Sequence, residues 1–201
     1  MTSALAITCT LKPSPAASSS ELLARQVLEA LAGHDVSGSL LRAVDYDIRP
    51  GVQRDMGDGD QWPAVLERVR AADIVLLATP TWLGHMASVT QRVLERLDAD
   101  LSETDEQGRP SLLGKVAMCA VVGNEDGAHK IIADVFGAMG DLGFTIPAQG
   151  STYWNDEAMG GRDYRDLDAV PEAVAATTAN AARNAAHLAA LLGRAQYPPY
   201  R

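Results

Sequence analysis

The sequence is poor in cysteine and has no cluster of basic residues, and each of these absences excludes a class of protein. Cys9 and Cys119 are the only cysteines, and each lies inside an apolar segment. This argues against a disulfide framework and fits a reducing compartment. The 17 Lys and Arg against 26 Asp and Glu give a net charge of −9, without a basic run that would neutralise nucleic-acid phosphates. We therefore expect no nucleic-acid partner.

Long apolar runs are also missing. No stretch reaches the length needed to cross a membrane, and the first residues have neither the basic nor the apolar region of a signal peptide. These features predict a cytoplasmic protein with no membrane partner. Hydrophobic residues make up 47% of the 201 positions, which is enough for one sizeable core. A single domain over 1–201 is expected.

Short apolar runs alternate with helical patterns along the chain. Runs typical of buried strands occur at Ala4–Cys9, Leu40–Val44, Ile74–Ala78, Val116–Val122 and Phe144–Ile146. The spacing of apolar residues predicts helices over Ser20–Leu31, Trp62–Ala71, Val89–Leu97, Ala128–Leu142 and Pro171–Leu192. This alternation predicts a doubly wound parallel sheet with strand order 2-1-3-4-5. A C-terminal extension, 147–201, adds an aromatic and glycine-rich loop and the long last helix.

Three loops leave the carboxyl ends of predicted strands, where ligands bind in open α/β sheets. The first, Thr10–Ser20, ends in three serines at the start of a helix, a position that favours an anion. A phosphate fits there, although a serine that merely caps the helix is the alternative. The second loop, Pro80–Met86, presents an aromatic residue, a glycine and a histidine. The third, Gly123–Gly127, is rich in polar residues and glycine.

Residue types exclude several occupants of such a crevice. A phosphoryl-accepting receiver domain needs acidic residues where Thr10 and Thr79 stand, and a flavodoxin-like tyrosine phosphatase needs an arginine where Pro15 stands. The spacing before Lys115 is wrong for a P-loop, and neither G-x-G-x-x-G nor G-x-S-x-G occurs. The acidic residues around Asp60 lack calcium-loop spacing, so no metal site is expected. What remains is a planar, amphipathic ligand with one phosphate, a description that fits FMN.

The motif T-P-T-x-x-G-x-M at Thr79–Met86, the serine-rich loop and the G-N-E-D-G turn resemble the flavodoxin-like NAD(P)H-dependent FMN reductases and quinone reductases. The resemblance covers residues 4–146. It implies non-covalent FMN, NAD(P)H as a transient co-substrate, a homodimer or homotetramer, and a small electron acceptor such as a quinone or nitroaromatic. By position, it assigns cofactor binding to Thr10, Lys12, Ser18, Ser19, Ser20, Pro80, Thr81, Trp82, Leu83, Gly84, His85, Met86, Gly123, Asn124, Glu125, Asp126 and Gly127.

No catalytic side chain is expected, because hydride transfer to a flavin needs stacking geometry more than an acid or base. Two other functions stay open: an electron-transfer flavodoxin whose acidic surface steers a basic protein partner, and a scaffold that has lost its cofactor. Individual roles are open as well. Trp82 either extends the stacking surface or belongs to the core, and His85 either stabilises charge on the reduced ring or caps the next helix. Tyr153 and Trp154 either close a substrate cavity or are core residues.

Overall fold

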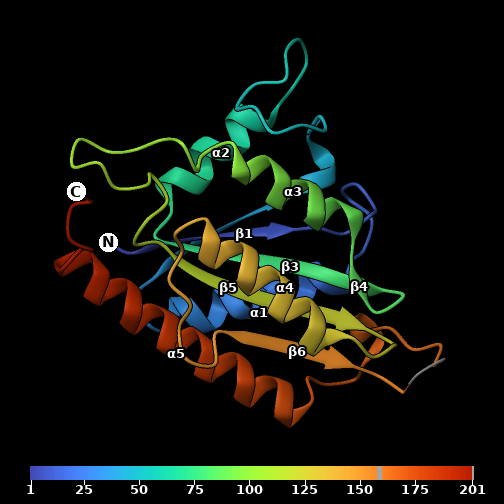
Figure 1. The fold of residues 1–201 in the computed structure, drawn as a ribbon. Helices are drawn as coiled ribbons and strands as arrows, with labels where there is room; N and C mark the ends of the chain where they lie inside the picture. Colours follow the sequence, from blue (N-terminus) through green and yellow to red (C-terminus); the bar gives the residue numbers. More distant parts are fainter. Residues whose placement is uncertain (158–159, 201) are drawn as a thin grey trace.

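The structure, a computed structural model, describes residues 1–157 and 160–200 (Figure 1). The elements along the chain are β1 (Ser3–Thr8), α1 (Ser19–Ala32), β2 (Ser37–Arg42), the short 3-10 helix η1 (Ala43–Asp45), α2 (Trp62–Ala71), β3 (Ile74–Trp82), β4 (His85–Met86), α3 (Ser88–Asp98), β5 (Val116–Gly123), α4 (Ala128–Asp141), β6 (Ser151–Asn155), the 3-10 helix η2 (Tyr164–Asp166) and α5 (Glu172–Arg194).

The sheet has the order β2-β1-β3-β5-β6, and these five strands are parallel. The two-residue strand β4 lies off this path and pairs antiparallel with the end of β3. Apart from this hairpin, the arrangement is the doubly wound order expected from the sequence. The central strand β3 pairs with β1 on one side and β5 on the other, which explains why its first residues form an unbroken apolar run.

The predicted position of the fifth strand is wrong. Within Phe144–Ile146, Thr145 makes one isolated bridge to Val116, and the fifth parallel strand is instead β6, which pairs with the second half of β5. The apolar side chain of Phe144 packs into the core beside α4 and does not mark a strand. As an edge strand, β6 alternates buried and half-buried residues, so it lacks the continuous apolar run of a central strand. The aromatic stretch predicted as a loop is therefore partly strand.

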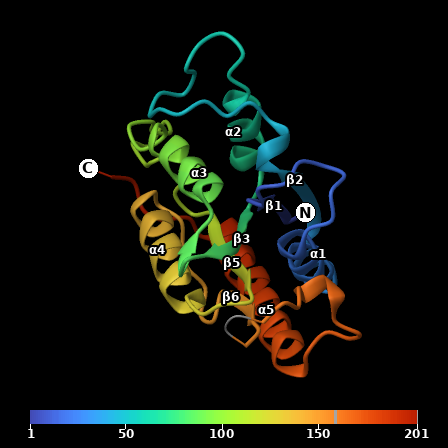
Figure 2. The same ribbon diagram turned by 90° about the vertical axis from the view of Figure 1, so that its right-hand side faces the viewer.

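Helices cover both faces of the sheet (Figure 2). Helices α2, α3 and α4 pack on one face and α1 and α5 on the other. Alternate residues of β3 supply the two cores: Val75 and Leu77 point to the first face, and Ile74 and Leu76 to the second. None of the helices in the described ranges is long and apolar enough to cross a membrane.

The position of the β3–β4 hairpin is fixed by a buried hydroxyl. Thr79 Oγ1 accepts a hydrogen bond from the backbone N–H of Ala87 at 3.1 Å and lies 2.8 Å from Thr90 Oγ1. Thr79 also donates to the carbonyl of Pro80 at 3.0 Å. These contacts tie the start of α3 to the end of β3 and hold the intervening hairpin beside the carboxyl edge of the sheet.

Candidate functional site

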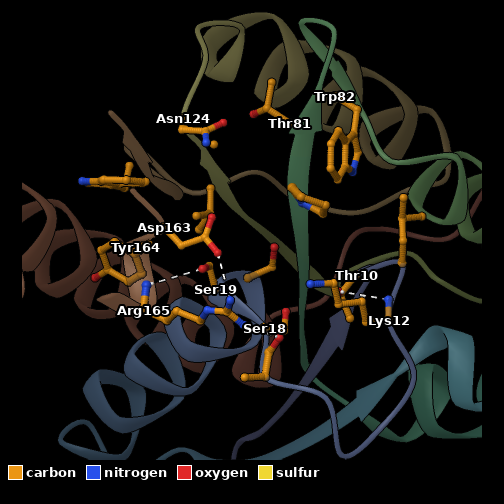
Figure 3. Close-up of a pocket in the computed structure, with 17 residues that line it drawn as sticks. Thr10, Lys12, Ser18, Ser19, Thr81, Trp82, Asn124, Asp163, Tyr164 and Arg165 are labelled. Atoms are coloured by element: carbon orange, nitrogen blue, oxygen red, sulfur yellow. Dashed lines mark hydrogen bonds and ion pairs between the residues drawn. The ribbon is translucent and has the colours of Figure 1, made fainter. Parts of the chain in front are cut away.

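A cavity of about 240 Å³ opens at the carboxyl edge of the sheet (Figure 3). The loop after β1, the end of β3, the end of β5 and the segment around η2 supply its walls. The residues that line it are Thr10, Leu11, Lys12, Ala17, Ser18, Ser19, Ser20, Pro80, Thr81, Trp82, Val122, Gly123, Asn124, Trp154, Asp163, Tyr164 and Arg165.

One end of the cavity is the N-terminus of α1. Ser18 is the N-cap, and its side chain accepts a hydrogen bond from the Glu21 N–H at 3.3 Å. The first backbone hydrogen bond of the helix runs from Leu22 N–H to the Ser18 carbonyl, so the Ser19 and Ser20 amides precede the intrahelical ladder. The capping role thus belongs to Ser18, while Ser19 and Ser20 place hydroxyls and amides at the positive end of the helix. This end of the cavity suits an anion.

A buried arginine fixes the loop that leads to this helix. Arg42 Nη1 donates to the carbonyls of Lys12 and Ala16, both at 2.9 Å, and the guanidinium pairs with the carboxylate of Glu21. Burial opposes ionisation of Glu21, but hydrogen bonds from Arg42 and Arg25 hold its pKa below the ordinary value. The shape of the anion-binding loop therefore depends on an ion pair that the sequence did not point to.

The β3–β4 hairpin forms a second wall. Pro80, Thr81 and Trp82 line the cavity, and the Trp82 side chain is 54% exposed, so the core alternative for this tryptophan is wrong. Leu83 and Gly84 form the turn with φ angles of 52° and 72°, conformations that glycine adopts more easily than leucine.

The rest of the hairpin lies beyond the lining. His85 is exposed and its Nδ1 lies 2.7 Å from the Leu83 carbonyl, while Ala87 is the N-cap of α3. The helix-capping alternative for His85 is therefore wrong. Leu83, Gly84, His85 and Met86 do not line the cavity; Met86 packs against the core.

The third loop supports the hairpin. Gly123 and Asn124 line the cavity, while Glu125 Oε1 accepts a hydrogen bond from the Leu83 N–H at 2.8 Å. Gly127 has φ +124°, and a Cβ at this position would lie 2.8 Å from the Gly84 Cα. Only glycine allows this approach of the two loops. Asp126 is exposed and, with Glu125 and Gly127, stands outside the lining.

Strand β6 and the segment after it supply a wall that sequence reasoning largely missed. The Trp154 and Tyr164 rings lie 5.5 Å apart, and the Tyr164 hydroxyl donates to Gln26 Oε1 at 2.7 Å. Burial raises the pKa of Tyr164 despite this hydrogen bond. Of the two aromatic residues singled out from the sequence, Trp154 lines the cavity and Tyr153 instead contacts His129 at 3.1 Å. No local pattern marks the contribution of η2, since its partners lie far away in the sequence.

The donor set fits FMN. Hydroxyls, helix amides and a guanidinium gather at one end, as a phosphate requires. Further along, Thr81 Oγ1 is buried and has no hydrogen-bond partner among the described residues, which leaves a polar atom for the edge of a ring. Within residues 1–157 and 160–200, no cluster of three His, Cys, Asp or Glu side chains could hold a metal ion.

The sheet order and the position of the cavity are those of a flavodoxin-like α/β protein. A sequence model of the NADPH-dependent FMN reductases matches residues 3–158, and the chain belongs to this family. Membership supports FMN as cofactor with NAD(P)H as co-substrate, as the resemblance of the three loops implied.

Two curated proteins are similar in sequence. The chain is 31% identical over 170 residues to an 8-demethyl-8-aminoriboflavin-5'-phosphate synthase of Streptomyces davaonensis, with 80% of this chain and 66% of that protein covered. It is 40% identical over 167 residues to a divalent metal cation transporter MntH of Mycobacterium bovis, with 81% of this chain and 24% of that protein covered. The chain thus spans less than two thirds of either relative.

Solved structures give the same fold. RosB with a bound intermediate, 8-demethyl-8-formylriboflavin-5'-phosphate, superposes with a TM-score of 0.89 at 28% identity, covering 98% of this chain and 82% of that one. The apo form of the NADH:FMN oxidoreductase EMOB gives a TM-score of 0.67 at 18% identity, covering 95% and 90%, and supports the fold alone.

Proposed function

We propose that this protein is an FMN-dependent oxidoreductase that takes a hydride from NAD(P)H and reduces a small acceptor such as a quinone or a nitroaromatic compound. The observation that carries the proposal is a single cavity that joins an anion-binding helix end to an exposed aromatic residue. FMN, when bound, supplies the ability to accept a hydride and to pass electrons on. The chain supplies binding and orientation.

At the phosphate end, Thr10, Ser19 and Ser20 would hold the ligand together with the first amides of α1. Thr10 and Ser20 are buried, so their hydroxyls are positioned by packing. Thr81 and Asn124 would face polar atoms of the ring, while Trp154 and Tyr164 supply aromatic surface to the lining. Each of these groups orients the ligand without exchanging protons.

Neither cysteine lines this cavity or is available there as a nucleophile. Burial raises the pKa of Cys9 to about 12 and also raises the pKa of Cys119, so both stay as thiols. His85 points to the Leu83 carbonyl, outside the lining. Chemistry that depends on stacking geometry agrees with these positions better than covalent catalysis does.

The mouth of the cavity favours a flat, apolar acceptor. Leu11 and Trp82 line it and are 47% and 54% exposed, so apolar surface faces solvent beside the ring position. Such surface binds aromatic compounds by burial and offset stacking. A quinone or nitroaromatic would bind at this apolar surface after the oxidised nicotinamide has left it. This alternation of the two substrates at one site predicts ping-pong kinetics.

Steady-state kinetics tests the proposal. The purified protein with added FMN should consume NADPH or NADH when a soluble quinone is present, with parallel lines in double-reciprocal plots. Turnover that requires a protein partner would instead support an electron-transfer flavodoxin, for which the net charge of −9 is suited. No turnover with either nicotinamide would contradict the proposal.

A second candidate is an enzyme that modifies the ring of FMN. It is favoured by the TM-score of 0.89 with RosB, whose structure holds a riboflavin-phosphate intermediate. Under this alternative, FMN is consumed as a substrate instead of being regenerated. Mass spectrometry of the flavin recovered after incubation with oxygen as oxidant and an amino-group donor separates the two: an unchanged FMN mass supports the oxidoreductase, and a changed mass supports ring modification.

We also propose that the chain forms a homodimer or homotetramer, as its family resemblance implies. Sedimentation equilibrium of the FMN-loaded protein tests this assembly, and a monomer mass at micromolar concentration would contradict it.

A further inference from the structure

The cavity has an uneven distribution of charge. Among the described residues that line it, Lys12 and Arg165 are the cations and Asp163 is the only acid. Lys12 and Arg165 both reach the surface, but the Arg165 side chain is only 33% exposed and belongs to the segment around η2. Arg165 is therefore the best-placed fixed positive charge near the first turn of α1.

Two contacts hold Arg165 against the anion-binding end. Its Nη1 donates to the Ala17 carbonyl at 3.0 Å, and its backbone N–H donates to Ser19 Oγ at 3.4 Å. Figure 3 shows the side chain reaching from η2 toward Ser18 and Ser19. These contacts join segments that are 146 and 148 positions apart in the sequence. The guanidinium thus adds to the partial positive charge of the helix end.

Arg165 also forms two weak ion pairs with neighbouring carboxylates. Its Nη2 lies 3.1 Å from Asp163 Oδ2 and its Nε 3.6 Å from Asp166 Oδ1, and both carboxylates are about half exposed to solvent. Such pairs contribute little to stability. A phosphate at the helix end would compete with them, because guanidinium and phosphate form strong charge-assisted hydrogen bonds.

We infer that Arg165 makes this cavity select a flavin with a 5'-phosphate over the unphosphorylated flavin, and that Asp163 weakens this preference. The inference rests on the proposed function. It assigns recognition to η2, which follows the residues 3–158 matched by the family. The helix end binds the phosphate with amides and hydroxyls, and Arg165 adds a full charge that riboflavin cannot use.

Binding of FMN and riboflavin to three variants tests the inference. Arg165→Gln removes the charge and keeps a hydrogen-bond donor, and it should raise the Kd for FMN by about tenfold while leaving the Kd for riboflavin within about twofold. Asp163→Asn removes a negative charge beside the phosphate and should lower the Kd for FMN by about threefold, with little change for riboflavin. Arg162→Ala is the matched control, because Arg162 is exposed, pairs with Asp156 and lies outside the lining.

The ratio of the two Kd values separates recognition from structural damage. A ratio of the Kd for FMN to the Kd for riboflavin that rises in Arg165→Gln and not in Arg162→Ala supports the inference. An unchanged ratio, or an equal loss of both flavins, contradicts it while leaving FMN binding by the unmodified protein intact. If the unmodified protein binds neither flavin, the proposed function itself fails, and this inference fails with it.

Discussion

Two threonines on β3 should respond in opposite ways to the same substitution. Thr79 and Thr81 are both buried, and valine has nearly the same shape as threonine. The Thr79 hydroxyl is bonded to the Ala87 N–H and the Thr90 hydroxyl, whereas Thr81 Oγ1 has no partner among the described residues. The structure therefore predicts that one hydroxyl serves the fold and the other serves a ligand.

The magnitudes follow from hydrogen bonding. Thr79→Val leaves the Ala87 amide buried and unpaired, which should lower the free energy of unfolding by about 1–3 kcal/mol. Thr81→Val removes an unpaired hydroxyl, so the protein without ligand should be as stable as before or more stable by up to about 1 kcal/mol. In a chain of this size, 1 kcal/mol corresponds to a shift in Tm of about 2–4 °C.

Thr81→Val should weaken FMN binding although it does not destabilise the ligand-free protein. Loss of one hydrogen bond to the ring of FMN weakens binding by about 1 kcal/mol, equivalent to a Kd about fivefold higher. Thermal unfolding without ligand and fluorescence titration with FMN measure the two effects on the same samples. If Thr81→Val destabilises the ligand-free protein as much as Thr79→Val does, or leaves the affinity for FMN unchanged, the reasoning is refuted.

Three further predictions concern the loop before α4 and the first turn of α1. Gly127→Ala should destabilise the protein by about 1–3 kcal/mol and weaken FMN binding, because the added Cβ would meet the Gly84 backbone at a residue with positive φ. The control Gly137→Ala adds its Cβ to open space on α4 and should stabilise the protein by about 0.5–1 kcal/mol. Chemical unfolding of both variants measures the difference, and equal effects would contradict it. Ser20→Asp should abolish retention of FMN through repulsion of its phosphate while the circular dichroism stays unchanged; an unaltered affinity would mean that the phosphate lies elsewhere. Since the pKa of Glu21 is lowered in the folded state, its contribution to stability is present above the ordinary pKa of a glutamate and is lost as the pH falls through the lowered value. Thermal unfolding between about pH 7 and pH 3 should therefore show an acid-dependent loss that is smaller in Glu21→Gln, and identical profiles would contradict this assignment.

The central fold was predictable because its strongest signal is local. The run from Ile74 to Ala78 is apolar without interruption, as a strand buried on both faces must be. The edge strand β6 lacks that signal, since three of its five residues are only partly buried. Phe144–Ile146 resembled a strand in its sequence because apolar residues also occur where a loop enters the core. Burial on one face alone leaves a weaker pattern.

The candidate site was predictable where it follows strand ends, and not where it depends on long-range packing. Ser20 lies in the first turn of the helix after β1, Thr81 lies at the end of β3 and Asn124 follows β5, so topology brings them together. Arg42 and Arg165 reach the anion-binding loop from segments distant in the sequence. No spacing rule links such residues, because their contacts arise only after α1, β2 and η2 have packed.

The most direct test of the central claim is an anaerobic titration of the FMN-loaded protein with NADPH and then with NADH, followed by visible absorption. At least one nicotinamide should bleach the flavin bands in a stoichiometric step, and a quinone should restore them. Failure to take up FMN, or flavin bands that persist with both nicotinamides in excess, would contradict the account.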